Sequence, residues 1–438
     1  MKEYYCINLK FKDERISTKT FHSHLFVSDE EMYFQVIDND IGSQIDRNFS
    51  ISGALGLLEE KLEVLESEVS LFFDKSRIYK MTSFQSDTQN TYFTIYVSKI
   101  ALIFPNKYKE YINEGTAYLN DNGLKVVNSF YSYFSNFDKN IFSISRMQGM
   151  EDFYEINQFS YRPELEFKNN EKRGSKEFTV KKIPTINYQF EDLEFEQIKS
   201  SIETICSFIS FCFGIRILPE KIVYRTEKDI VVYRDNSPNN KTFVSDFSTV
   251  FRMLEKNYNI QRILKTDWST NYFLKKEQFD KAIDNFLHSR EVNLSASYLL
   301  LFNIIEIFNE KSENEKFEFN DTKKENFDKA YDLISKSLKN ADDVDLLKDK
   351  WNGITNKIEL KPMKSPLENG LLINNINALD FGYSFSRLKK TRDKLTHGSI
   401  SSIKEKDLKA QMYSLQKISL KLILANLGFK DELKKSAT

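Results

Sequence analysis

The pattern of apolar residues changes along the chain, and this change constrains the fold more than any other feature of the sequence. Early segments such as 32–37 and 92–104 are dense in aromatic and β-branched residues, which favours strands, and Pro105 would end the second of them. From about residue 275, apolar residues recur every three or four positions, as on one face of a helix. The sequence therefore predicts an α+β multidomain protein, in which a β-rich N-terminal region precedes an all-α helical bundle.

The β-rich region contains one clear helical pattern and several turn signals. Apolar residues recur at helical spacing from Ile198 to Cys212, so we expect a helix near 192–214 that Gly214 would end. The amphipathic stretch 57–69 could also form a helix, although its pattern is ambiguous. Short strands are expected at 222–224 and 230–233, turns at 121–123 and 169–174, and a loop at 235–241.

The second part of the chain predicts a series of helices. Segment 294–308 is apolar almost all round, which is typical of a buried central helix. The last helix has two end signals, because Ser402 and Glu405 fit a capping box and Gly428 would follow its final turn. The other helices are expected at 279–287, 327–338, 346–358 and 381–395, with a connection that contains Pro362 and Pro366.

The length of 438 residues exceeds one typical domain. We place a boundary between the loop at 235–241 and about Lys275. This division gives a β-rich sensor or regulatory region at 1–270 and a helical domain at 275–430. The formal net charge is only −1, so any basic surface that attracts nucleic acid must be local.

The counts of glycine and histidine exclude several kinds of site. Among only 13 glycines there is no glycine-rich loop with the spacing that cradles a nucleotide phosphate. The four histidines are too few to favour a multi-histidine metal site, so we expect neither metal nor cofactor. These histidines are His22, His24, His288 and His397.

The cysteines and the apolar segments bear on cellular location. Cys6, Cys206 and Cys212 make neither a disulfide framework nor a CxxC pair, which fits a reducing compartment. The N-terminus lacks the apolar core of a signal peptide, and the apolar stretch 205–217 is shorter than the roughly 20 residues that a membrane-spanning helix needs. We therefore expect a cytoplasmic protein with no membrane partner.

Three minor features have ordinary structural explanations. His22 and His24 lie on one face of an expected strand and could hold a metal, but no third ligand is near in the sequence. Cys206 and Cys212 are best explained as core residues of a helix. The aromatic pairs 92–93 and 130–131 could stack on bases, but core packing is the stronger expectation in a chain with 14% aromatic residues.

The segment RLKKTRDKLTHG, residues 387–398, carries the most informative chemistry. Phe381, Phe385, Leu388, Arg392 and Leu395 are spaced by four or three residues, so Arg392 occupies an apolar stripe. A buried guanidinium must have a carboxylate partner, a wet interface or an anionic ligand. The acid of the apolar segment 299–308, Glu306, is one candidate partner.

His397 follows Arg392 by five residues and precedes Gly398, so we expect the helix to end there and the imidazole to turn back towards Arg392. An imidazole beside a fixed cation is suited to proton transfer in phosphodiester cleavage, with the guanidinium holding the scissile phosphate. RNA supplies its own nucleophile, the 2′-hydroxyl, so this chemistry needs no metal.

The residues around this pair are basic. Segment 381–410 contains eight Lys or Arg and three Asp or Glu, a local net charge of +5. Such a cluster attracts a phosphate backbone regardless of its sequence. The expected RNA-binding residues are Arg387, Lys389, Lys390 and Lys394.

An Arg-polar-x₃-His motif at the end of the penultimate helix of a helical C-terminal domain resembles the HEPN superfamily. Here the motif runs from Arg392 through Asp393 to His397. The following Gly398, the acid Glu306 and the long N-terminal region make the chain most similar to the ApeA-like HEPN proteins of bacterial defence. The resemblance covers about 275–430 and is weaker over the N-terminal half, where it concerns only the general layout.

The resemblance implies a metal-independent endoribonuclease that acts as a homodimer, with two motifs facing one cleft. It implies that Arg392 and His397 are catalytic, that Asp393 orients them, and that Glu306 supports them. It also implies a toxin of abortive infection that cleaves tRNA or other RNA after a phage-derived trigger, with the N-terminal region restraining or triggering the nuclease.

Other interpretations of the same residues remain. Arg392 could form a structural salt bridge, and His397 could simply be a cation near a helix C-terminus. The domain could be a catalytically inert HEPN module that binds RNA, a nucleotide or a partner protein. A DNA-targeting restriction component is a third alternative, against which the lack of an acidic metal-site motif argues.

Overall fold

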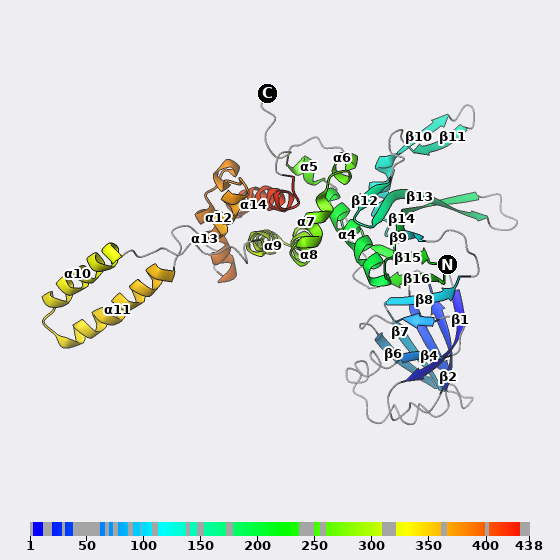
Figure 1. Cartoon of the computed structure of the whole chain (residues 1–438), viewed down its shortest axis with the longest axis horizontal. Helices are drawn as coiled ribbons and strands as arrows, with labels where there is room; N and C mark the ends of the chain where they lie inside the picture. The colour runs from blue at the N-terminus through cyan, green and yellow to red at the C-terminus, as the bar shows by residue number, and fades with distance from the viewer. Residues whose placement is uncertain are drawn as a thin grey trace. The chain divides into compact units, whose positions relative to one another are not determined.

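The computed structural model divides the chain into two compact units, Met1–Thr270 and Asn271–Thr438. Its described strands all lie in the first unit, and most of its described helices lie in the second (Figure 1). The protein is therefore a mixed α/β protein. The structure describes residues 3–11, 20–28, 31–37, 62–65, 70–72, 78–85, 91–97, 99–106, 113–136, 141–146, 153–171, 178–235, 249–254, 260–308, 321–360, 366–398 and 403–429.

The first unit contains an antiparallel sheet of six strands in the order β4-β1-β2-β3-β7-β6. Leu25 and Val27 on β2 and Met32 on β3 are fully buried, and β3 matches the strand expected at 32–37. The strands are β1 (Glu3–Phe11), β2 (Thr20–Val27), β3 (Met32–Ile37), β4 (Leu62–Leu65), β6 (Ile78–Gln85) and β7 (Thr91–Val97).

A second antiparallel sheet has the order β12-β13-β14-β9-β15-β16-β8-β5. The expected strands at 222–224 and 230–233 are the paired β15 and β16. Its members are β5 (Ser70–Phe72), β8 (Lys99–Pro105), β9 (Glu114–Leu119), β12 (Tyr154–Ile156), β13 (Phe159–Glu171), β14 (Phe178–Phe190), β15 (Pro219–Arg225) and β16 (Asp229–Asp235). The short α3 (Gly123–Val127), η1 (Asn128–Phe130) and the separate pair β10 (Tyr131–Asn136) and β11 (Ile141–Arg146) connect β9 to β12.

One long helix, α4 (Phe195–Phe213), provides the main helical part of the core of this unit. It ends as expected, because Gly214 adopts a left-handed conformation with φ of 64°. Cys206 and Cys212 are buried, and burial raises the pKa of both thiols, so they are core residues as expected. Three short helices follow α4 in the chain, α5 (Val250–Met253), α6 (Ile260–Leu264) and α7 (Trp268–Leu274).

Three expectations for this unit were wrong. Segment 92–104 is not one strand, because β7 pairs with β3 and β6 whereas β8 pairs with β16 and β5. The possible helix at 57–69 contains the strand β4, whose backbone pairs with β1. The turn expected at 169–174 begins later, because β13 pairs with β14 through Glu171. The remainder of 57–69, residues 172–174 and the loop residues 236–241 lie outside the described part of the chain.

The second unit is helical, and α9 lies at its centre. Helices α8, α12, α13 and α14 all contact α9, as the apolar pattern of 294–308 predicted. The elements are α8 (Lys276–His288), α9 (Leu294–Ile307), α10 (Asp321–Ser337), α11 (Ala341–Leu360), α12 (Pro366–Ile373), η4 (Ala378–Phe381), α13 (Phe385–Thr396) and α14 (Glu405–Asn426).

Helix boundaries differ from expectation in three places. Phe381 belongs to η4 rather than to the next helix, because Gly382 turns the chain at φ of 91° and Ser384 caps α13. The connection expected near Pro366 is the helix α12, which uses proline at its first position. Lys404, not Ser402, precedes α14, and it provides no side-chain cap. Ser402 itself lies outside the described residues.

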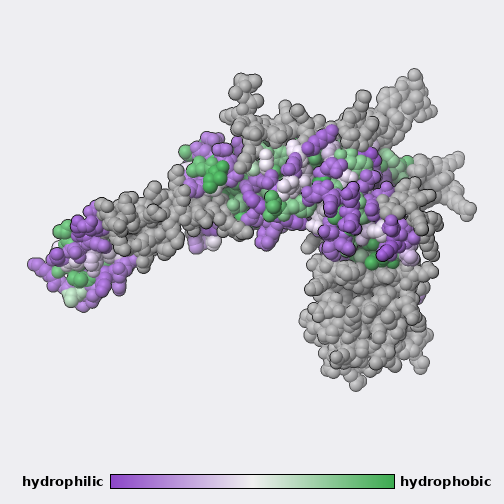
Figure 2. Space-filling view, in the orientation of Figure 1, coloured by the Kyte–Doolittle hydropathy of each residue, from purple (hydrophilic) through white to green (hydrophobic). Residues whose placement is uncertain are grey.

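Helices α10 and α11 are held together by aromatic side chains. Trp351 packs against Phe327 and Tyr331, with ring centroids 4.4 and 5.6 Å apart. Leu333 and Leu346 are exposed on a surface that is otherwise mostly hydrophilic (Figure 2). None of the helices in the described ranges is long and apolar enough to cross a membrane.

Buried tyrosines of the large sheet predict a loss of stability in alkali. Burial raises the pKa of Tyr224 to about 12, whereas an unfolded chain ionises tyrosine near pH 10. The protonated Tyr224 therefore contributes to the free energy of unfolding fully below pH 10. This contribution is lost between about pH 10 and 12, because only the unfolded chain then releases the proton. We expect Tyr224→Phe to reduce the fall in unfolding free energy between pH 9 and pH 11, measured with urea.

The matched control is Tyr413→Phe, because Tyr413 is an exposed tyrosine of the second unit. It should leave the alkaline decline unchanged. An identical decline in the wild type and in Tyr224→Phe would show that burial of this hydroxyl does not contribute.

Candidate active site

Helix α13 carries the motif residues and is fixed at both ends. At its start, the Ser384 hydroxyl accepts a hydrogen bond from the backbone N–H of Arg387, at 3.4 Å. Its buried face consists of Phe385, Leu388, Thr391 and Leu395, and the helix contacts both α9 and α14. The position of Arg392 beside this buried face follows from that register.

Arg392 is held by two carboxylates and a ring. Its Nη2 bonds to Oε1 of Glu306, and its Nη1 lies 3.2 Å from Oδ1 of Asp393. The guanidinium carbon lies 5.6 Å from the centroid of the Phe302 ring, one helical turn before Glu306 on α9. Of the three possibilities that the sequence left open for Arg392, the structure shows a carboxylate partner, the candidate Glu306.

The position of Glu306 makes the pair with Arg392 important for α9. Glu306 is the penultimate residue of α9, where the backbone carbonyls give the helix end a partial negative charge. A carboxylate at this end is unfavourable by itself, since it adds like charge. The guanidinium of Arg392 compensates for it, so the ion pair stabilises α9 and fixes Arg392 at the same time.

The ion pair remains accessible to solvent. The side chains of Arg392 and Glu306 are 32% and 31% exposed. A guanidinium has five N–H donors, and the bonds to Glu306 and Asp393 use only two of them. The remaining donors can bind an anion such as a phosphate without displacing either carboxylate.

His397 does not turn back towards Arg392, which corrects one expectation. The helix does end here, because Gly398 has φ of 74°. However, the His397 backbone N–H still donates to the Asp393 carbonyl at 3.0 Å, so His397 keeps the helical register. Its side chain therefore lies about 140° around the axis from Arg392. The chain turns at Gly398, one residue after His397, so the turn does not change the direction of the imidazole.

The imidazole of His397 is exposed. Within the part of the chain that the structure describes, no hydrogen bond or ion pair joins it to Arg392, Asp393 or Glu306. A single copy of the chain thus brings Arg392, Asp393 and Glu306 together and leaves His397 apart from them.

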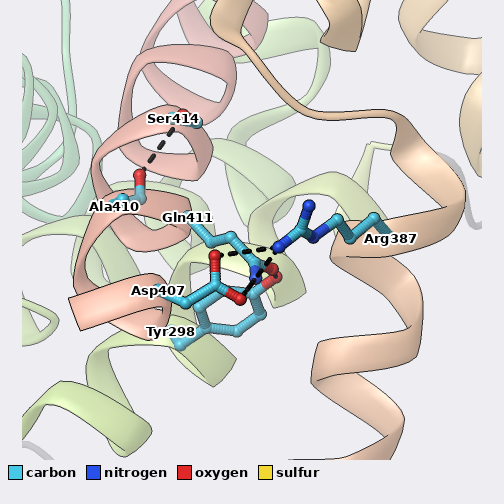
Figure 3. Close-up of polar contacts among 6 residues, drawn as sticks. All are labelled: Tyr298, Arg387, Asp407, Ala410, Gln411 and Ser414. Atoms are coloured by element: carbon cyan, nitrogen blue, oxygen red, sulfur yellow. Dashed lines mark hydrogen bonds and ion pairs between the residues drawn. The ribbon is translucent and has the colours of Figure 1, made fainter. Parts of the chain in front are cut away.

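A second polar network includes Arg387 of the same helix, one to two turns before Arg392 (Figure 3). The Nη2 of Arg387 lies 3.0 Å from both carboxylate oxygens of Asp407 at the start of α14. Gln411 donates to Asp407 at 3.0 Å, and its Oε1 lies 3.4 Å from the Tyr298 hydroxyl of α9. This network links α9, α13 and α14.

Tyr298 connects the network to the turn that carries Arg392. Its hydroxyl donates to the Leu388 carbonyl at 2.9 Å, and this carbonyl lies four residues before Arg392. Burial raises the pKa of Tyr298, so the hydroxyl stays protonated and remains a donor. This network was not predicted from the sequence, because Tyr298 and Gln411 lie on buried helix faces whose pattern indicates only core packing.

The expected RNA-binding residues differ in their surroundings. Arg387 is engaged by Asp407 and lies near the Tyr383 ring, so it is not a free cation. Lys389 and Lys390 are exposed on α13, and Lys394 is half-buried. Lys389, Lys390 and Lys394 remain candidates for phosphate contacts.

No alternative metal site emerges from the described residues. None of their histidines, cysteines, aspartates and glutamates forms a group of three or more that could hold a metal ion. His24 is exposed on β2, and the side chain of His22 lies outside the described part. The aromatic pair 130–131 is buried in the core, whereas the side chains of 92–93 are also outside it.

No known protein family, curated protein or solved structure matches this chain.

The coupling between Arg392 and Glu306 can be measured by a double-mutant cycle. We expect the variants Arg392→Ala, Glu306→Ala and the double variant to give a coupling free energy of about 1 kcal/mol in urea unfolding, because the pair is only partly exposed. Either single replacement leaves the other charge at the end of α9 without its main partner.

The matched control is the Arg387–Asp407 pair, whose side chains are 56% and 36% exposed. Its coupling should be smaller, because solvent screens exposed charges more strongly. A coupling near zero for Arg392–Glu306, or one smaller than that of the control, would contradict the structural role of the pair.

Proposed function

We propose that the protein is a metal-independent endoribonuclease of the HEPN type, with Arg392 binding the scissile phosphate and His397 transferring the proton. The observation that carries the proposal is the partly exposed guanidinium of Arg392. It is held by Glu306 and Asp393, and among the described residues these bonds use only two of its five N–H donors. It lies beside a basic helix face that ends in an exposed histidine. A fixed guanidinium of this kind can stabilise the charge that develops on a phosphate oxygen.

The proposed reaction uses the RNA's own 2′-hydroxyl as nucleophile. The 2′-oxygen attacks the adjacent phosphorus, and the bond to the 5′-oxygen breaks. His397 in its neutral form accepts the 2′-hydroxyl proton, and a protonated imidazole or water delivers a proton to the leaving 5′-oxygen. The products are a 2′,3′-cyclic phosphate end and a 5′-hydroxyl end.

The register of α13 supports a homodimeric centre. The helical register places Arg392 and His397 about 140° apart around the axis of α13. We propose a two-fold homodimer in which the His397 of one copy lies beside the Arg392 of the other. The active unit under this proposal is a homodimer formed through the helical domain.

The biological role proposed from the resemblance is cytoplasmic anti-phage defence. The helical domain would act as a toxin of abortive infection that cleaves tRNA or other RNA, and a phage-derived activator would trigger it. The β-rich first unit would be the sensor or regulatory region.

The nuclease proposal predicts cleavage without metal. We expect the full-length protein to cleave total bacterial RNA in EDTA and to leave 2′,3′-cyclic phosphate ends. Arg392→Lys and His397→Ala should each lower the rate by about a hundredfold or more, because each removes a group that acts in the transition state. Lysine is preferred at 392 because it keeps a positive charge beside Glu306.

His288→Ala is the matched control for His397→Ala. His288 is also an exposed histidine at the end of a helix, where it pairs with Glu291. Its replacement should leave cleavage unchanged. Full activity in a folded His397→Ala protein would refute the proposed mechanism.

Mixing two inactive variants tests whether two chains share one centre. If Arg392 and His397 act from different copies, a heterodimer of Arg392→Lys and His397→Ala contains one intact centre. An equal mixture that exchanges subunits should recover about a quarter of wild-type activity, because half of the dimers are mixed and each has one of two centres. No recovery, despite subunit exchange shown by differently tagged chains, would mean that both residues act within one chain.

The separation of Arg392 and His397 also favours one alternative, a catalytically inert module that binds RNA, a nucleotide or a partner protein. Under this alternative, RNA binding would weaken with salt and depend on Lys389 and Lys390, with no cleavage in any of the variants.

A further inference from the structure

The outer part of β13 and β14 forms a ribbon of only two strands. Both strands have 13 residues and pair with each other throughout. β9 pairs with β14 only over 185–189, and β12 pairs with β13 only over 159–161. Among the described strands, residues 165–171 and 178–184 therefore have no neighbour except each other (Figure 1). We call these two segments the outer ribbon.

Side chains become exposed along the outer ribbon. Leu165 and Pro184, a cross-strand pair at its base, are buried. Further out on the same face, Phe167 and Val180 are 43% and 46% exposed. A phenylalanine is an unusual residue at such an exposed strand position, where a polar residue would be soluble. Its exposed side chain offers an apolar surface for a ligand.

The opposite face of the outer ribbon carries an unfavourable charge pair. Lys168 and Lys181 lie directly opposite each other, and both are exposed. Like charges at opposed positions destabilise a strand pair. No ion pair within the described residues neutralises either lysine. Glu166, two residues before Lys168 on this face, accepts a side-chain hydrogen bond from Tyr118.

We propose that the outer ribbon is a binding site for single-stranded nucleic acid. An exposed aromatic ring stacks on an unpaired base, and lysines bind the adjacent phosphates. Neither edge of the outer ribbon has a further neighbour among the described strands, so the long side chains of Lys168 and Lys181 can reach round these edges to the phosphates of a nucleic acid that stacks on Phe167. Bound phosphates remove the repulsion between Lys168 and Lys181.

Single-stranded nucleic acid fits the outer ribbon better than a duplex does. The bases of a duplex stack on each other and leave no face free for Phe167. This inference goes beyond the proposed nuclease and does not depend on it, because all four residues that carry it lie in the first unit.

Binding is tested with full-length His397→Ala protein, so that RNA stays intact whether or not the chain is a nuclease. The probes are a short unstructured RNA, the DNA of the same sequence, and the RNA duplex, each labelled for fluorescence anisotropy. We expect the single strands to bind more tightly than the duplex. Comparison of RNA with DNA then identifies the natural class of ligand.

Phe167→Ala should weaken single-strand binding about tenfold, because it removes one stacked base. Phe167→Trp should retain the affinity. The matched control is Val180→Ala, at an equally exposed residue on the same face that cannot stack, and it should change the affinity less than twofold.

The double replacement Lys168→Gln and Lys181→Gln should lower the slope of log affinity against log salt by about 1.4, because each phosphate contact on a single strand contributes about 0.7. The same variant should be at least as stable as its parent to urea, because it removes a repulsion. Lys228→Gln, an exposed lysine elsewhere in this unit, is the control and should change neither property.

Equal effects of Phe167→Ala and Val180→Ala would overturn the proposal, as would an unchanged salt slope or tighter binding of the duplex. A second test replaces Val180 by a photo-reactive phenylalanine analogue and measures crosslinking to the bound nucleic acid. Its result does not depend on a change in affinity. Crosslinking to the single strand is expected there, and no crosslinking under saturating probe would also overturn the proposal.

Discussion

The burial of α9 is the constraint on which the helical unit depends. Its side chains are apolar on nearly every side, so helices must cover it, and α8, α12, α13 and α14 all do so. This requirement brings α13 against α9 with Leu388 and Leu395 facing inward. Arg392 then reaches Glu306 at the end of α9, because both lie at the margin of the buried surface. The candidate site is a consequence of how a central helix is enclosed.

Much of the secondary structure could be predicted from the sequence, because long periodic segments carry a strong signal. The helix α4 and its terminal Gly214, the strands β15 and β16, and the central α9 were all identified from apolar spacing. The division at Thr270 lies within the interval in which a boundary was placed. Sheet membership was not predictable, since β7 and β8 have the same propensity and differ only in the strands with which they pair.

The site itself shows which relations a single sequence reveals. The cost of burying a guanidinium required a carboxylate, a wet interface or an anionic ligand beside Arg392, and Glu306 was one candidate acid, which the structure shows in contact with it. The orientation of His397 did not follow, because one residue of helical register decides the direction of the imidazole. The role of Tyr298 was hidden for a similar reason. The sequence does not indicate which backbone carbonyl accepts a hydrogen bond from the hydroxyl of a buried tyrosine. The acceptor for Tyr298 is the carbonyl of Leu388, 90 residues further along the chain.

The hydrogen bond from Tyr298 to Leu388 has a mechanical consequence. A hydroxyl reaches one chosen carbonyl at only one longitudinal register of two packed helices, and sliding by one turn of about 5.4 Å would break it. Helix α13 therefore behaves as a rigid mount against α9, and Asp407 and Gln411 of α14 brace the same point. If an anion binds to Arg392, we expect the guanidinium to move by rotation about the side-chain bonds of the arginine, while the backbone of α13 stays in place. Helix α13 is thus a fixed support for the Arg392 side chain.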